Sequence, residues 1–314
     1  MKIMVLTGGL GNQMFQLAAG LSLAMGDELF LETKLCKPRL GKAGLPEVLE
    51  LELPQEIKLI NRQYNVFISK ILGFNIRMTV KSRKIENIKL IKYFVKIMSS
   101  FFLSIYFKKI FLLINENELN QYKILQSKMN VLYLGYFQTL TFVSHKRVND
   151  LLFNLKPKEN NKILNSLEVK SQSKKILIMH VRLGDYRNEP EFGLLSTGYY
   201  REALNAINRC KKIDEIWLFS NEIRQALLYI PENFRSKVVF IEEGLNSSVE
   251  ILYAMRLGSN YVIANSSLSW WGAYTTFAKS PQIFAPTPWF KMRNDVENFI
   301  PLNWSRISGY NEYE

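Results

Sequence analysis

The sequence predicts an α/β protein of two Rossmann-like domains that face each other, each with a parallel sheet covered by helices. Short apolar runs alternate with helical patterns from residue 174 onward. The chain opens on a strand, a glycine turn and a helix, which is the start of a βαβ unit. With 314 residues, 47% of them hydrophobic, the chain can fill two cores and is not disordered.

The elements of the first half follow from local patterns. A strand is expected at 2–6, a glycine turn at 8–11, a helix at about 13–25 and strands at 28–32 and 131–138. Between residues 38 and 130 the pattern is mostly helical with weak boundaries. We therefore expect an N-terminal α/β domain at 1–155 that carries a basic helical insertion at about 55–130.

The second half alternates clearly. Polar residues fill 156–175, which is the best linker candidate, with a surface helix over part of it as the alternative. A C-terminal α/β domain is therefore expected at 156–314. Right-handed crossovers require its strands to be parallel. The expected strands are 176–180, 215–219, 238–241, 261–264 and 282–284, and the expected helices are 198–210, 223–228, 247–257 and 268–278.

Residue counts exclude several classes of site. Two cysteines and two histidines give neither a disulfide framework nor a zinc or histidine-rich metal centre. No two of the five aspartates are separated by a single residue, so the D-x-D pair typical of metal-dependent sugar transferases is missing. The N-terminal apolar run is too short for a signal peptide, so the expected location is the cytoplasm.

Positive charge is concentrated in one region. The net charge is +13, and residues 55–130 contain 14 Lys or Arg and 4 Glu. Lysines interleaved with Ile, Leu and Phe favour peripheral contact with the inner face of an anionic membrane, and a membrane-surface adaptor is one alternative function. A solvated helical face explains the same pattern. No nucleic-acid motif accompanies the charge, so nucleic acid is not an expected partner.

The first chemistry-bearing segment is TGGLGNQMFQ at 7–16. A glycine turn between a strand and a helix brings free backbone N–H groups close to an anion. The segment resembles a dinucleotide fingerprint, with Glu32 as the ribose acid, but Met14 stands where that fingerprint needs a small residue. The fingerprint would indicate a dehydrogenase, but a dehydrogenase gives no role to Asn12 and Gln13. These two side-chain amides are suited to hydrogen bonds with sugar hydroxyls.

The second segment, HVRLGDY, follows the buried strand at 176–180. Ligands of open α/β sheets bind beyond the carboxyl ends of such strands. Arg182 beside His180 is therefore well placed to bind a diphosphate through paired N–H donors. The alternative is an Arg182–Asp185 ion pair with no ligand.

Three further strand ends carry polar residues. In NSSLSWWGAY, Ser266 and Ser267 lie where a strand meets a helix, so they are helix caps or part of a phosphate cradle. Ser220 and Asn221 line the same crevice or begin the next helix. Glu250 accepts guanine N–H groups if it is buried, and an exposed helical position is the simpler expectation.

Five motifs in one order, GGLGNQMFQ, GYFQ, HVRLGDY, FSN and ANSSLSWWGAY, make residues 2–289 closely resemble the bacterial α-1,2-fucosyltransferases. The resemblance implies a GT-B-like fold, GDP-β-L-fucose as donor bound by the C-terminal domain, inversion and no metal cofactor. It implies transfer to the 2-hydroxyl of a terminal galactose on a lipid-linked surface glycan such as an O-antigen unit. A sugar-nucleotide-binding protein without turnover and another nucleotide-sugar transferase of this fold are the alternatives.

The resemblance also implies residue roles. Arg182 contacts the diphosphate, and Asp185 holds the loop that carries Arg182. Together with Asn12, these two residues are the implied catalytic residues. The implied donor-binding residues are His180, Arg182, Ser220, Asn221, Glu250, Ser266, Ser267, Gly9, Gly11 and Gln13. Two positions depart from the family pattern: Leu183 replaces a second arginine, and the acidic residue at 250 stands one place early, which is about 100° around a helix.

Overall fold

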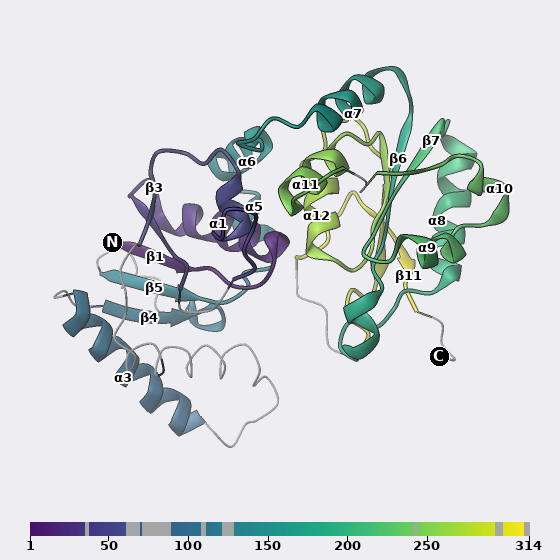
Figure 1. Ribbon diagram of the computed structural model, residues 1–314. Coiled ribbons are helices and arrows are strands. Elements are labelled where there is room, and N and C mark those ends of the chain that lie inside the picture. The colour runs from purple at the N-terminus through teal and green to yellow at the C-terminus, as the bar shows by residue number, and fades with distance from the viewer. Residues whose placement is uncertain are drawn as a thin grey trace. The chain divides into compact units, whose positions relative to one another are not determined.

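The computed structural model describes residues 1–34, 38–60, 70, 89–107, 111–120, 129–241, 244–292 and 298–310. The chain forms two compact units, Met1–Leu151 and Leu152–Glu314 (Figure 1). The boundary falls inside helix α6 (Lys146–Asn154), whereas the sequence analysis placed it after residue 155. Cys36 and much of the basic region at 55–130 lie outside the described residues.

The first unit contains a five-stranded parallel sheet in the order β3-β2-β1-β5-β4. The strands are β1 (Lys2–Val5), β2 (Leu29–Glu32), β3 (Ile57–Leu59), β4 (Phe111–Asn115) and β5 (Asn130–Leu134). The mostly helical expectation for residues 38–130 was wrong at β3 and β4. Pairing with a neighbouring strand, which a local pattern cannot show, stabilises both of these short runs.

The described helices of this unit are α1 (Leu10–Ala24), α3 (Lys89–Phe107), α5 (Leu140–Val143) and the start of α6, with 3₁₀ turns η1 (Glu47–Glu50) and η3 (Glu116–Glu118). Helix α1 begins three residues earlier than expected, so Gly11 lies in its first turn rather than in the preceding loop. Helix α3 packs against β4, the edge strand of the sheet (Figure 1).

The second unit contains a six-stranded parallel sheet in the order β11-β10-β9-β6-β7-β8. The strands are β6 (Ile176–Val181), β7 (Glu215–Ser220), β8 (Val238–Phe240), β9 (Asn260–Val262), β10 (Ile283–Thr287) and β11 (Ser305–Ser308). Every residue of β6 is buried, as an apolar strand in the middle of a parallel sheet requires. Strand β11 was not predicted, because an edge strand with one buried residue, Ile307, has little apolar pattern.

Helices cover both faces of this sheet, with α7 (Lys162–Ser173), α11 (Ser248–Arg256) and α12 (Ser267–Tyr274) on one side (Figure 1). The other side carries α8 (Thr197–Cys210), α9 (Ile223–Ala226) and α10 (Glu232–Arg235), and 3₁₀ turns η4 (Gly184–Asn188) and η5 (Leu227–Tyr229) complete the unit. Two parallel sheets covered by helices confirm the predicted fold class.

Much of the stretch at 156–175 is α7, so the surface helix that was the alternative to a linker is found there. Asn161 caps this helix by accepting hydrogen bonds from the backbone N–H groups of Ile163 and Leu164. Within this helix Leu164 and Leu167 are the buried residues, while Ile163 and Val169 are exposed and the other side chains are polar. That narrow apolar stripe is why the sequence looks like a linker.

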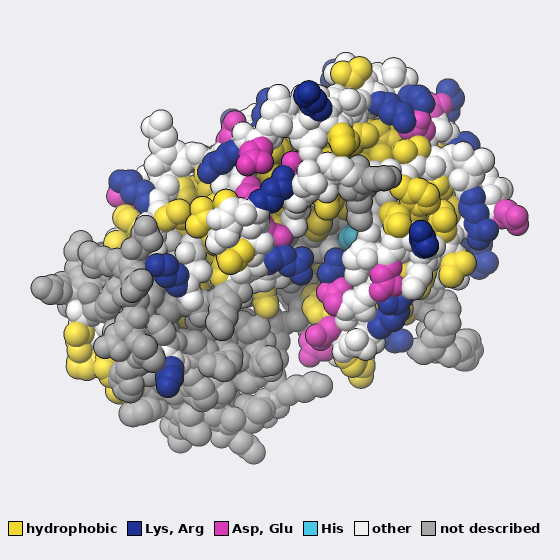
Figure 2. Space-filling view, in the orientation of Figure 1, with side chains coloured by type: hydrophobic (Ala, Val, Ile, Leu, Met, Phe, Trp, Pro, Cys, Tyr) yellow, Lys and Arg dark blue, Asp and Glu magenta, His cyan; other side chains and the backbone are white. Residues whose placement is uncertain are grey.

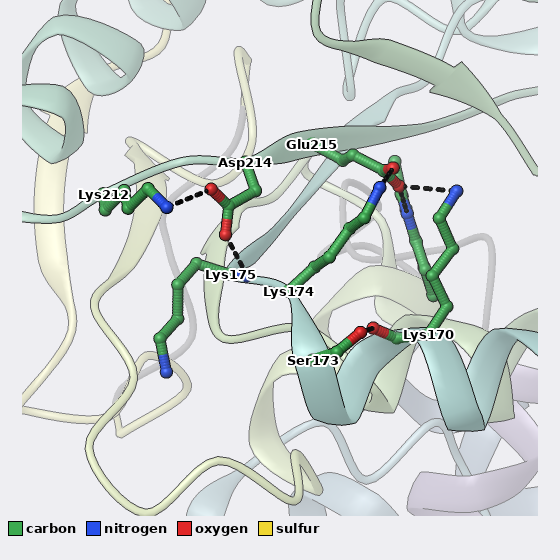
Figure 3. Close-up of polar contacts among 8 residues, drawn as sticks. Lys170, Ser173, Lys174, Lys175, Lys212, Asp214 and Glu215 are labelled. Atoms are coloured by element: carbon green, nitrogen blue, oxygen red, sulfur yellow. Dashed lines mark hydrogen bonds and ion pairs between the residues drawn. The ribbon is translucent and has the colours of Figure 1, made fainter.

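The amino ends of β6 and β7 carry a cluster of charged residues (Figure 3). The Glu215 carboxylate lies 2.8 Å from Lys170 Nζ, contacts Lys174 Nζ and accepts a 3.0 Å hydrogen bond from Trp217 Nε1. Asp214 accepts from the backbone N–H of Lys175 at 2.8 Å. These contacts fix the entry into both strands, at the sheet edge opposite the polar motifs.

In each sheet one pair of neighbouring strands belongs to two different connected runs of strands, and we call this place the switch point. In the first unit it lies between β1, which leads to β2, and β5, which follows β4; in the second it lies between β6, which leads to β7, and β9, which leads to β10. Ligand sites of open parallel sheets form outside the carboxyl ends of the strands at this point. The segment GGLGNQ follows β1 and GYFQ follows β5, while HVRLGDY spans the end of β6 and NSSLSWW follows the end of β9. The four motifs therefore meet in two pairs.

Candidate functional site

The N-terminal glycine turn presents the start of helix α1. Gly8 has a φ of +71°, and a Cβ there would lie 2.6 Å from Asn12 Nδ2. Gly9 is the N-cap of α1, and the backbone N–H groups of Asn12 and Gln13 donate to its carbonyl. Gly9 and Gly11 thus shape the turn from which Asn12 projects.

A buried carboxylate already occupies this helix N-terminus. Glu47, which is 4% exposed, accepts a 2.6 Å hydrogen bond from the backbone N–H of Leu10. The expectation of free N–H groups at this turn was therefore wrong at Leu10. An anionic ligand at the same amide would be repelled by the negative charge of Glu47. Glu47 comes from a separate turn, η1, so the contact depends on tertiary folding.

Gln13 faces protein and not a ligand, which corrects the expectation that it faces the sugar. Its side chain is fully buried. The amide nitrogen donates to the carbonyls of Gly8 at 2.8 Å and Arg39 at 3.0 Å, and the amide oxygen accepts from the Val48 N–H at 2.9 Å. These bonds fasten the 39–48 segment onto α1.

Asn12 is the polar side chain of this turn that stays partly exposed. Its Oδ1 accepts a 2.9 Å hydrogen bond from Nε2 of Gln138, in the GYFQ motif. A second link joins the same two motifs, because Gln16 Nε2 donates to the Gly135 carbonyl at 2.9 Å. The two N-terminal motifs therefore form one polar site at the β1/β5 switch point.

In the second unit Arg182 forms the ion pair that the sequence analysis held as an alternative. Its Nη2 lies 2.8 Å from Asp185 Oδ2, with the Arg182 side chain 20% exposed and the Asp185 side chain 53% exposed. The Arg182 guanidinium also lies 5.4 Å from the centre of the Tyr186 ring. Its Nε is buried and has no hydrogen-bond partner in the described part of the chain. The ion pair thus satisfies only part of the guanidinium.

His180 is buried at the end of β6. Burial, reinforced by the charge of Arg182, lowers the pKa of its imidazole to about 3. The ring is therefore neutral at physiological pH and does not act as a cation. Within the described residues its Nδ1 lacks a hydrogen-bond partner, although the atom is buried. Buried polar atoms without partners are rare in folded proteins and mark this strand end as a candidate binding site.

The arginine loop is fixed by the end of β7. Asn221 Oδ1 accepts a 2.9 Å hydrogen bond from the Leu183 N–H, and the Ser220 hydroxyl accepts from the Glu222 N–H at 3.1 Å. Leu183 is 1% exposed and packs in the hydrophobic core of the unit. The side chain at 183 therefore serves packing, and the predicted polar residues Ser220 and Asn221 serve the geometry of neighbouring loops.

Tyr186 connects the arginine loop to the end of β9. Its hydroxyl donates to the Asn265 carbonyl at 3.2 Å and bonds to the Ser266 hydroxyl, and burial raises its pKa to about 12. Ser266 is the N-cap of α12 but gives the helix no side-chain hydrogen bond. Ser267 is the first residue of α12 and is partly exposed. An uncapped helix N-terminus therefore lies beside the arginine loop.

Glu250 is 3% exposed, so the exposed position expected for it was wrong. It is the third residue of α11, where its carboxylate accepts from the Asn246 N–H at 2.5 Å. Its own N–H donates to the hydroxyl of Ser247, the N-cap, at 3.2 Å. Glu250 thus stabilises the start of α11, and any contact with guanine adds to that role.

One cavity of the second unit lies apart from the predicted site residues. An open cavity of about 530 Å³ is lined by α8 and β11 residues that include Arg201, Arg209 and Ser308, and by none of the predicted site residues. Among the described residues no group of three or more His, Cys, Asp or Glu side chains is arranged to hold a metal ion. No helix in the described ranges is long and apolar enough to cross a bilayer.

Comparison with known proteins identifies the family. The model described as Glycosyl transferase family 11 matches residues 3–308. The chain belongs to glycosyl transferase family 11. The resemblance to the bacterial α-1,2-fucosyltransferases is thereby confirmed at the level of the family, and the chain is a glycosyltransferase.

Curated relatives of this family 11 chain match over nearly their whole length. The O-antigen biosynthesis glycosyltransferase WbnK of Escherichia coli is 27% identical over 319 residues, covering 92% of this chain and 95% of the relative. An α-1,2-colitosyltransferase of Escherichia coli is 28% identical over 321 residues, covering 96% and 97%. Among solved structures, the fucosyltransferase NodZ from Bradyrhizobium matches with a TM-score of 0.49 and 13% identity, covering 88% and 91%.

Four residues that form hydrogen bonds within the two polar sites of this family 11 chain were not assigned from the sequence. Gln138, Tyr186 and Asn265 lie inside the quoted motifs, so proximity to the assigned residues was a usable signal. Asn265 Nδ2 donates to the Phe192 carbonyl at 3.0 Å and so holds the loop after β9. Glu47 gave no signal, because nothing in its local sequence distinguishes it from the neighbouring glutamates.

Proposed function

We propose that the chain transfers L-fucose from GDP-β-L-fucose to the 2-hydroxyl of a terminal galactose on a surface-glycan precursor. The acceptor oxygen attacks the anomeric carbon from the face opposite the diphosphate, so the β-linked donor gives an α-linked product. The bond between the anomeric carbon and the diphosphate oxygen breaks, GDP departs and the acceptor hydroxyl loses its proton. No metal takes part in this proposal, and the protein itself stabilises the leaving diphosphate.

One contrast between the two switch-point helices carries the assignment of the donor to the second unit. The N-terminus of α1 is occupied by Glu47, through the 2.6 Å bond from the Leu10 N–H. The N-terminus of α12 receives no side-chain cap from Ser266 and lies next to the arginine loop. A helix N-terminus with free N–H groups and a nearby guanidinium favours a diphosphate. These features support GDP binding at α12.

Arg182 supplies the charge that a metal would otherwise provide. Negative charge accumulates on the departing diphosphate, and donors fixed in advance stabilise the transition state more than the intact donor. A hydrogen bond to a charged group contributes about 1.5–3 kcal/mol, so loss of the Arg182 contact should slow the reaction at least about tenfold. Ser266, Ser267 and the α12 N–H groups add donors to the same oxygens.

The N-terminal unit is proposed to serve the acceptor side. Asn12 has its amide oxygen bound to Gln138, which leaves its Nδ2 donor directed away from that contact. An amide donor there suits a hydrogen bond to a sugar hydroxyl, or to the acceptor oxygen as that oxygen loses its proton during transfer. Asp185 keeps its proposed role of orienting Arg182, at 2.8 Å.

The curated relatives support both the pathway and the linkage. One is named for O-antigen biosynthesis and the other for α-1,2 transfer. The second relative transfers colitose, according to its name, and it is as similar to this chain as the first. GDP-colitose, whose sugar is a 3-deoxy form of fucose, is therefore a second candidate donor. An O-antigen precursor on the inner membrane face is the proposed acceptor.

The decisive test supplies GDP-fucose or GDP-colitose with a panel of β-galactosides, and measures GDP release and the product linkage by NMR. Arg182→Lys and Arg182→Ala should both lower kcat by at least about tenfold, because a lysine cannot reproduce the two-pronged donor geometry. Arg187→Ala is the matched control, since Arg187 lies on the same loop and forms an ion pair with Glu222. It should retain activity.

Several outcomes contradict the proposal. Full activity in Arg182→Ala removes the proposed source of charge stabilisation. Turnover that a chelator abolishes and manganese restores shows that a metal is required. Tight GDP binding without release from GDP-fucose in the presence of every acceptor favours the alternative, a sugar-nucleotide-binding protein.

A further inference from the structure

Glu116 places a carboxylate at the carboxyl edge of the first sheet. It begins η3, directly after β4, and β4 pairs with β5 so that Ile114 lies beside Tyr133. Tyr133 lies in turn beside Met4 of β1. The three parallel strands are neighbours, as Figure 1 shows, so their carboxyl ends lie along one edge. Glu116 is therefore one strand away from the switch point between β5 and β1.

This carboxylate binds the turn of the GYFQ motif. Glu116 Oε2 accepts a 2.9 Å hydrogen bond from the Tyr136 N–H. Gly135 has a φ of +152°, and a Cβ there would lie 2.5 Å from the Glu116 Cβ and 2.7 Å from its Oε2. The absence of a side chain at 135 is what lets the glutamate approach so closely. Gln138 of the same motif binds Asn12, so the turn links the carboxylate to the amide proposed for the acceptor side.

The second oxygen of this carboxylate is available to a ligand. Glu116 is partly exposed, and its Oε1 makes no hydrogen bond or ion pair with the residues that the structure describes. On the face shown in Figure 2, Asp and Glu side chains mostly lie beside Lys or Arg side chains, and Glu116 differs from them. An ionised carboxylate only accepts hydrogen bonds, so its free oxygen suits a hydroxyl donor.

Three other glutamates of the described part of this unit lie at strand ends or at the α1 N-terminus, and each is buried or paired. Glu32, at the end of β2, is fully buried, and Glu47 is 4% exposed. Glu118 forms a 2.8 Å ion pair with Lys96. Of these four glutamates, Glu116 alone combines exposure with an unpaired oxygen.

We propose that Glu116 is the general base that takes the proton of the acceptor hydroxyl. In the transfer step the acceptor oxygen forms its bond to the anomeric carbon, the bond from that carbon to the diphosphate oxygen breaks, and GDP leaves with the electron pair. The hydroxyl proton passes to Glu116 Oε1 and from there to water. The inference rests on the proposed function, because that function places the acceptor at the first switch point.

Glu116→Gln tests this role with little change of shape. The glutamine oxygen still accepts the Tyr136 N–H, but the amide cannot take up a proton. General bases contribute about 10²–10⁴-fold, so kcat for transfer to a β-galactoside should fall at least about a hundredfold. The KM for the donor and the affinity for GDP, measured by calorimetry, should stay within about twofold, since the proposed donor site lies in the second unit.

Formate separates a chemical role from a structural one. Glu116→Ala removes the carboxylate and leaves space for a small one, so added formate should raise kcat of this variant at least about tenfold and leave Glu116→Gln unchanged. Glu50→Gln is the matched control. Glu50 also accepts a backbone N–H, that of Lys42 at 2.6 Å, and a Cβ at Gly41 would collide with its carboxylate. This variant should keep the parental kcat.

The other outcomes overturn the proposal in distinguishable ways. Parental kcat in Glu116→Gln removes the base, and the proposed function survives if Arg182→Ala is impaired in the same assay. A loss that formate does not restore, or an equal loss in Glu50→Gln, shows that the glutamate only supports the turn. A parent that turns over neither GDP-fucose nor GDP-colitose rejects the proposed function and the base with it. Thermal unfolding verifies that the three variants keep the fold.

Discussion

The amide of Asn12 is oriented by Gln138, whose Nε2 donates a 2.9 Å hydrogen bond to Asn12 Oδ1. The two residues are 126 positions apart and lie after β1 and β5, the strands on either side of the first switch point. Because the amide oxygen is bound, the Nδ2 group, which lies on the side of Gly8, is the end left to act as a donor. Gln138 is therefore a positioning residue for Asn12.

We expect Gln138→Glu to lower kcat more than it changes KM. The new carboxylate accepts where the amide donated, so Asn12 must turn its amide around and present Oδ1 in place of Nδ2. Loss of one oriented donor should cost about tenfold in kcat. Steady-state kinetics with varied acceptor measures the change.

Gln138→Ala is the companion variant, and it leaves Asn12 free to rotate. Its kcat should fall between that of the parent and that of Gln138→Glu. If both variants retain the parental kcat, the pair has only a structural role.

Gly184→Ala should disrupt the arginine loop. Gly184 has a φ of +45°, and a Cβ there would lie 2.2 Å from Asn221 Nδ2. The collision displaces Asn221 from the Leu183 N–H that it holds at 2.9 Å. We expect loss of activity together with destabilisation of about 1–3 kcal/mol, measured by urea unfolding.

Gly44→Ala controls for the backbone cost. Gly44 has a φ of +68° but no atom within 4 Å of an added Cβ. It should cost only about 1 kcal/mol, the strain of a left-handed alanine, and leave turnover unchanged. Equal effects of the two substitutions would show that the contact with Asn221 has no consequence.

His180 should make stability depend on pH. Its folded pKa of about 3 lies below the ordinary value of 6.5, so between these values the unfolded chain binds more protons than the folded chain. Stability must therefore fall as pH falls through that window, by up to about 1.4 kcal/mol per pH unit. The free energy of unfolding of the parent minus that of His180→Gln should shrink from pH 7 to pH 4. A constant difference would contradict the assigned pKa.

Glu215 should stabilise the second unit through its lysines (Figure 3). Burial acts to raise its pKa, but hydrogen bonds from Lys170, Lys174 and Trp217 outweigh burial and lower it to about 2, from 4.5. The stabilisation is fully present above pH 4.5 and is lost as pH falls through 2. Glu215→Gln should lower the free energy of unfolding at pH 7 by about 2 kcal/mol.

Asp214→Asn is the neighbouring control for this cluster. Its partner Lys212 has a side chain that is 78% exposed, so solvent screens the pair. The midpoint of urea unfolding should shift less for Asp214→Asn than for Glu215→Gln. A larger shift for Asp214→Asn would contradict the importance of burial at Glu215.

Strong local patterns allowed much of the second unit to be predicted. The apolar run at 176–179 predicted a buried parallel strand, and the polar residues that follow were therefore expected at the carboxyl edge of a sheet. The motif order led to the family in the same way, because each motif is a contiguous run of residues. Strand β4 was missed because a short apolar run does not by itself distinguish a strand from a helix, and its pairing with β5 is a tertiary contact. Strand β11 was missed because it contains a single buried apolar residue.

The sequence by itself determined the two parallel sheets, the family and the segments that carry polar chemistry, because these depend on contiguous residues and on strand polarity. Tertiary structure alone decided which polar groups are already occupied. It placed the Glu47 carboxylate on the α1 N-terminus, enclosed Gln13, turned Leu183 into the core and left α12 without a side-chain cap. Hydrogen bonds between residues far apart in the chain satisfy some groups and not others, and no local pattern encodes that choice.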